Sequence, residues 1–117
     1  MPYKPGLHIL SEFTTERTEL LNYSLQFRDF LAQAITHNQL NKVGEVWHDF
    51  DGGGFTAVVC LTESHISIHT WPEYGMATFD VFLSNYQQVN DGKARDLYDS
   101  IIRFYDATEI QKNEIKR

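Results

Sequence analysis

Residues 43–83 read VGEVWHDFDGGGFTAVVCLTESHISIHTWPEYGMATFDVFL, and this stretch decides the fold. Apolar and polar side chains alternate along most of it, with many β-branched and aromatic residues, which is typical of β-strands. Glycine at 52–54 and the Pro72–Gly75 segment interrupt the alternation at positions that suit turns between strands. The pattern therefore predicts four consecutive strands, at residues 43–50, 55–62, 65–70 and 76–83.

The flanking segments add a strand and a helix on either side. Leu7–Phe13 alternates like a strand, and residues 16–37 carry apolar side chains at helical spacing, with Thr14 and Thr15 as candidate N-caps. A second helix is expected from Asp91, followed by a short strand around 108–115. The order β-α-β-β-β-β-α-β over 117 residues predicts a single α+β domain, a two-layer sandwich with a mostly antiparallel sheet and two helices on one face.

Composition excludes several classes of function. The chain has 10 Lys and Arg against 16 Asp and Glu, a net charge of −6, and no basic cluster beyond its last two residues, so nucleic acid is not an expected partner. No apolar run approaches the length of a membrane span. The lone Cys60 excludes an internal disulfide and predicts a cytoplasmic protein. A chain this small has little spare surface unless it pairs with a copy of itself.

A metal site is one interpretation of three potential ligands that lie four residues apart: His65, His69 and Glu73. On a helix the three side chains would share one face, which suits zinc. The intervening Ile66 and Ile68 favour a strand, along which positions four apart are separated by about 13 Å. No metal is therefore expected, and the two histidines are ordinary candidates for the polar face of a sheet. The polar composition of this segment, between two apolar strands, still makes it the best candidate for a functional site.

The segment Glu63–Gly75, ESHISIHTWPEYG, resembles the self-cleavage and active-site segment of the prokaryotic S-adenosylmethionine decarboxylases. The resemblance extends upstream through Gly6–His8 and Ser11–Phe13 and downstream through Asp80–Phe82, and the predicted order of elements agrees with it.

The resemblance implies that the chain is a proenzyme that cuts itself between Glu63 and Ser64. The products would be a β chain, 1–63, and an α chain, 64–117, whose first residue becomes a pyruvoyl group. By resemblance, His69 is the base that removes the α-hydrogen of Ser64, and imidazole has a suitable pKa. Thr56 stands where the family usually has a serine whose hydroxyl assists the cut.

The same resemblance implies the substrate. The pyruvoyl group would form a Schiff base with S-adenosylmethionine and promote loss of carbon dioxide, which yields the aminopropyl donor for spermidine synthesis. Phe50 would stack on the adenine and Glu73 would bind the ribose hydroxyls. Family members are dimers or higher assemblies of αβ units, so a homodimer or larger assembly is expected.

One departure from the family pattern keeps alternatives open. Ser84 stands where the family has a cysteine that donates a proton to the decarboxylated carbon, and Asn85 replaces the usual glycine. A hydroxyl is a far weaker acid than a thiol. A pyruvoyl-dependent arginine or ornithine decarboxylase and a non-catalytic paralogue are therefore alternatives, although Phe50 and Glu73 favour an adenosyl substrate.

Overall fold

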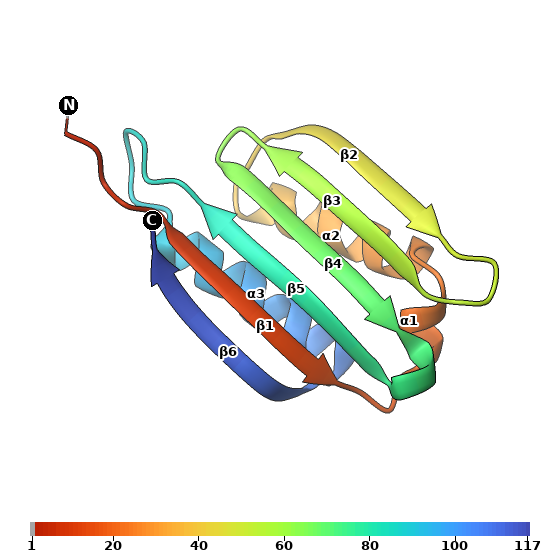
Figure 1. Ribbon diagram of the computed structural model, residues 1–117. Coiled ribbons are helices and arrows are strands. Elements are labelled where there is room, and N and C mark those ends of the chain that lie inside the picture. The colour runs from red at the N-terminus through yellow and green to blue at the C-terminus, as the bar shows by residue number, and fades with distance from the viewer. Residues whose placement is uncertain (1) are drawn as a thin grey trace.

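The computed structural model describes residues 2–117 and contains one six-stranded antiparallel sheet (Figure 1). Along the sheet the strand order is β2-β3-β4-β5-β1-β6. The strands are β1 (Leu7–Thr14), β2 (Lys42–Asp49), β3 (Phe55–Leu61), β4 (Ser64–Trp71), β5 (Met76–Leu83) and β6 (Thr108–Lys116). Three α-helices, α1 (Glu19–Asn22), α2 (Leu25–His37) and α3 (Asp91–Tyr105), cover one face of the sheet. The predicted two-layer α+β sandwich is confirmed.

Alternation along the strands separates the two faces of the sheet. In β5 every second residue is buried, and Ala77, Phe79, Val81 and Leu83 point toward the helices. Their partners in β4, Ile66 and Ile68, are buried on the same side. The core lies between this face and the apolar sides of α2 and α3, where Phe27, Phe13 and Tyr105 pack ring against ring. No helix formed by residues 2–117 covers the opposite face of the sheet, which is called the open face below.

The first helical segment differs from the prediction. A continuous helix over 16–37, capped by Thr14 or Thr15, is wrong: Thr14 ends β1, and two helices are separated at Tyr23 and Ser24. The break has a tertiary cause, because Asp49 at the end of β2 accepts hydrogen bonds from the Ser24 backbone N–H at 2.9 Å and from its hydroxyl at 3.1 Å. The first contact satisfies a backbone N–H that a continuous helix would have paired internally.

The turns and the last strand follow the prediction more closely. The loop after β2 closes with a hydrogen bond from the Phe50 N–H to the Gly54 carbonyl oxygen, 2.9 Å, and Gly53 and Gly54 have φ angles of +99° and +93° that favour glycine. Asp91 is the first residue of α3, and the N-cap position belongs to Asn90. The expected final strand is β6, which pairs with β1 and brings Arg117 against Gly6 at the sheet end where β5 finishes.

Candidate active site

The predicted cleavage site lies in the tight hairpin between β3 and β4. Leu61 pairs with Ser64, which leaves only Thr62 and Glu63 in the turn. Ser64 has a φ angle of +149°, in a region that residues with a Cβ rarely occupy. Such a conformation costs about 1–3 kcal/mol and persists only where the surroundings impose it. The strained residue is the serine that, by the resemblance, becomes the pyruvoyl group.

The carbonyl group of Glu63 is held by a backbone donor from the neighbouring strand. β5 pairs with β4 through Leu83 and Ser64, so the next residue, Ser84, comes beside the hairpin. The Ser84 N–H donates a 2.7 Å hydrogen bond to the Glu63 carbonyl oxygen. A donor aimed at this oxygen stabilises the negative charge that develops when a nucleophile attacks the carbonyl carbon. The prediction from the sequence concerned only the Ser84 side chain. A hydrogen bond donated by a backbone N–H cannot be predicted from the type of residue that carries it.

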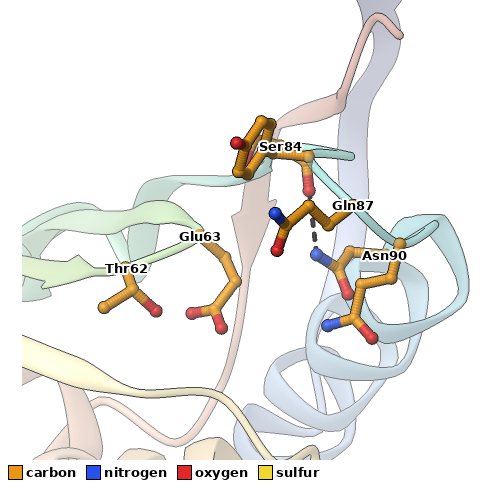
Figure 2. Close-up of a pocket in the computed structure, with 7 residues that line it drawn as sticks. Thr62, Glu63, Ser84, Gln87 and Asn90 are labelled. Atoms are coloured by element: carbon orange, nitrogen blue, oxygen red, sulfur yellow. Dashed lines mark hydrogen bonds between the residues drawn. The ribbon is translucent and has the colours of Figure 1, made fainter. Parts of the chain in front are cut away.

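An open pocket of about 490 Å³ adjoins the hairpin (Figure 2). The Glu63 side chain reaches toward it from one side, and the loop between β5 and α3 forms the other side. Its size and its many amide and hydroxyl groups suit a small polar molecule. The lining residues are Thr62, Glu63, Ser84, Tyr86, Gln87, Gln88 and Asn90.

Thr56 and His69, the two other residues assigned to processing, do meet. They are opposite one another in the β3–β4 pair, and the Thr56 hydroxyl is hydrogen-bonded to Nδ1 of His69. His69 is exposed on the open face. Phe50, at the end of β2, and Glu73, in the 3-10 helix η1 (Pro72–Tyr74), belong to the same end of the sheet. Phe50 is 48% exposed.

The predicted site residues thus form two groups at opposite ends of β4. We call Glu63, Ser64 and Ser84 the serine half-site, and Phe50, Thr56, His69 and Glu73 the histidine half-site. His69 follows Ser64 by five residues along an extended strand, which separates them by about 16 Å at 3.3 Å per residue. A proton transfer needs heavy atoms within about 3 Å. One chain therefore does not bring His69 to Ser64.

On the open face, three titratable residues that are distant in sequence lie close together: His8, His65 and Asp80. Nε2 of His8 lies 3.2 Å from Oδ2 of Asp80, and one ligand atom each from His8, His65 and Asp80 lie within 4.8 Å of one another. An Arg117 guanidinium nitrogen is 3.4 Å from Nδ1 of His8, which favours the proton on Nε2, facing Asp80. Burial and the neighbouring His8 lower the pKa of His65. His8 and Asp80 are therefore hydrogen-bonded, with His65 beside them, whereas His69 and Glu73 lie farther along the chain and do not join His65.

Comparison with known proteins agrees with the resemblance. The S-adenosylmethionine decarboxylase family model matches residues 7–117. The S-adenosylmethionine decarboxylase proenzyme of Archaeoglobus fulgidus is 39% identical over 77 residues, which is 66% of this chain and 69% of that protein. The Aquifex aeolicus proenzyme of the same name is 36% identical over 112 residues, 96% of this chain and 80% of that protein.

A solved structure has the same fold. The crystal structure of the adenosylmethionine decarboxylase from Aquifex aeolicus superposes with a TM-score of 0.80 at 31% identity, covering 99% of this chain and 91% of that one. The fold, the strained hairpin serine and these matches define a decarboxylase class. The chain belongs to the S-adenosylmethionine decarboxylase family, and the family predicted from its sequence is confirmed. Within residues 2–117, no helix has the length and apolar character needed to cross a membrane.

Proposed function

We propose that this chain cuts itself between Glu63 and Ser64, converts Ser64 into a pyruvoyl group, and then decarboxylates S-adenosylmethionine. The observation that carries the proposal is the pairing of a strained serine with a polarised carbonyl: Ser64 at φ +149° follows the carbonyl that the Ser84 N–H holds at 2.7 Å. The relatives that match over most of the chain are named proenzymes, which supports processing.

The proposed cut begins with an acyl shift in the β3–β4 hairpin. The Ser64 hydroxyl attacks the Glu63 carbonyl carbon, the Ser84 N–H stabilises the oxyanion, and breaking the C–N bond leaves an ester between Glu63 and the Ser64 oxygen. A peptide bond at a strained residue is a good candidate for this shift, because the ester frees Ser64 from its imposed φ. Removal of the α-hydrogen then expels Glu63 as a carboxylate. The dehydroalanine that remains takes up water and releases ammonia, which leaves the pyruvoyl group.

Removal of the Ser64 α-hydrogen needs a base, and His69 of the same chain lies too far away to act as one. We propose that a second copy of the chain contributes it. In a two-fold dimer that pairs the open faces, the same surface of each copy forms the contact. If the β4 strands of the two copies run antiparallel, the serine half-site of one copy lies opposite the histidine half-site of the other. The open face also exposes Val46, Val58 and Trp71, apolar side chains that such a contact would bury.

The histidine half-site also supports the choice of substrate. Phe50 offers an exposed aromatic ring for adenine, and Glu73 follows β4 within reach of the same end of the sheet. Once formed, the pyruvoyl ketone supplies an electrophile for the substrate amine and an electron acceptor as carbon dioxide leaves. The product would be the aminopropyl donor for spermidine synthesis. An exposed, unpaired Cys60 fits the reducing cytoplasm.

Release of carbon dioxide from carboxyl-labelled S-adenosylmethionine tests the substrate directly. The purified protein should release label from S-adenosylmethionine and not from arginine or ornithine. Treatment with a carbonyl reagent such as phenylhydrazine should abolish the release, because it consumes the ketone. Release from arginine or ornithine alone would replace the proposed substrate, and no release from a fully cleaved protein on any of the three would favour a non-catalytic paralogue.

A further inference from the structure

Asn85, which stands where the family usually has glycine, is buried at the junction of three segments. Its side-chain N–H groups donate to the Pro5 carbonyl oxygen and to Oδ1 of Asp91, both at 2.9 Å. Its Oδ1 accepts the backbone N–H of Asn90 at 2.6 Å. The side chain therefore ties the end of β5 both to the N-terminal segment and to the start of α3, and only 6% of the residue is exposed.

Asn90 continues the connection to Ser84. Its amide nitrogen donates a 2.8 Å hydrogen bond to the Ser84 carbonyl oxygen, drawn as a dashed line in Figure 2, and the residue is 2% exposed. Ser84 is thus held on both sides of its Cα: Asn90 fixes its carbonyl, and its own N–H is aimed at the Glu63 carbonyl oxygen. We call Asn85 and Asn90 the asparagine clamp.

The N-terminal segment also packs tightly against Ser84, at Gly6. A Cβ at Gly6 would lie 2.4 Å from the Leu83 carbonyl oxygen and 2.9 Å from the Ser84 Cα, so the N-terminal segment packs directly on the end of β5. Lys116 contacts Asp91 from β6 and lowers the pKa of that carboxyl, as Asn85 does to a smaller degree. Asp91 therefore stays ionised and keeps accepting the Asn85 hydrogen bond.

We infer that Asn85 and Asn90 are positioning residues for self-cleavage, which hold the Ser84 N–H where the Glu63 oxyanion forms. The inference rests on the proposed function. A donor stabilises an oxyanion only if it is fixed before the reaction, since a mobile donor must be reoriented at the moment the charge develops. In this chain a glycine after Ser84 would leave that loop without the three side-chain hydrogen bonds of Asn85. Where the family usually has a glycine, Asn85 of the asparagine clamp thus links the end of β5 to the N-terminal segment and to the start of α3.

The test measures the self-cleavage rate of Asn85→Ala against Asn38→Ala. Asn38 is a matched control outside the site: it is also buried, and it donates to the Ala34 carbonyl oxygen at 3.0 Å and to Asp96 at 2.9 Å. We expect Asn85→Ala to cut about tenfold to a hundredfold more slowly than Asn38→Ala. Thermal midpoints of both substitutions, each measured with Ser64→Ala so that the chain stays whole, show whether the loss of stability is similar.

Hydroxylamine separates positioning from a general structural defect. It cleaves the ester that follows the acyl shift, so it should not accelerate chain separation in Asn85→Ala, where the shift itself is slow. Fast release by hydroxylamine would place the defect after the shift and overturn the inference, as would a rate equal to that of Asn38→Ala. If Asn85→Ala does not fold, Asn90→Ala, which loses one hydrogen bond, should show the same slow shift. An uncut wild-type chain would refute the proposed function, whereas a cut wild type with unaffected clamp variants would refute only this inference.

Discussion

Co-expression of Ser64→Ala chains with His69→Ala chains should restore a cleavage that neither variant completes alone. About 16 Å separates the two residues along β4, and a proton transfer bridges only about 3 Å, so the proposed site combines Ser64 of one chain with His69 of another. With equal expression and random pairing, half of the dimers are mixed. Each mixed dimer has one intact site of its two, so about a quarter of all sites should mature.

The assay uses two affinity tags of different mass, one on each variant. Sequential purification on both tags yields mixed dimers only, and intact-mass spectrometry then identifies which chain is cut. The His69→Ala chain, which keeps Ser64, should be the one that matures, and the Ser64→Ala chain should stay whole.

A reciprocal mixture strengthens the test. Wild-type chains paired with chains carrying both substitutions have Ser64 opposite a partner without His69, so mixed dimers should stall before the pyruvoyl group forms. Complete maturation of the wild-type chain in those dimers, or no cleavage in the first mixture, would refute a site shared between two copies.

Further outcomes follow from single substitutions. Ser64→Ala should remain one folded, inactive chain, seen by gel and circular dichroism, and any cut in it would exclude Ser64 as the nucleophile. His69→Ala should stall at the ester, so hydroxylamine should release two chains; maturation at the wild-type rate would exclude His69 as the base. Ser84→Cys should raise turnover of S-adenosylmethionine and slow its inactivation, because a thiol is a stronger acid, and no gain would favour a changed substrate. Burial lowers the pKa of His65, so the thermal midpoint of the wild-type protein should be constant above the ordinary histidine pKa of about 6.5 and fall as the pH drops below it. The thermal midpoint of His65→Gln should fall less over the same pH range. An equal fall in the two proteins would contradict this assignment.

The sheet could be predicted from the sequence because its signal is local. Alternation in β3, β4 and β5 follows directly from which face each side chain occupies, and glycine marks the turn before Phe55. The break at Ser24 could not be predicted, since it depends on Asp49, twenty-five residues away, accepting the bonds that end one helix and precede the next.

The resemblance names candidate residues for the site, but it does not give their arrangement in space. Glu63, Ser64 and His69 stand out through the resemblance, but their roles alone do not show that a straight strand keeps the serine and the histidine apart. The donor on the Glu63 carbonyl is a backbone group, so residue type cannot reveal it. From the sequence, Asn85 is visible only as a departure from the family pattern, because its hydrogen-bond partners, Pro5 and Asp91, cannot be read from residue type.

The intact mass of the purified wild-type protein tests self-processing at Ser64 most directly. We predict two chains in place of one of 13.6 kDa: residues 1–63 with an ordinary terminal carboxylate, and residues 64–117 lighter by one ammonia than the same peptide beginning with serine. Borohydride should add two hydrogens to the second chain, as expected for a ketone. A single uncut chain, or a second chain that begins with an intact serine, would contradict a pyruvoyl enzyme made from Ser64.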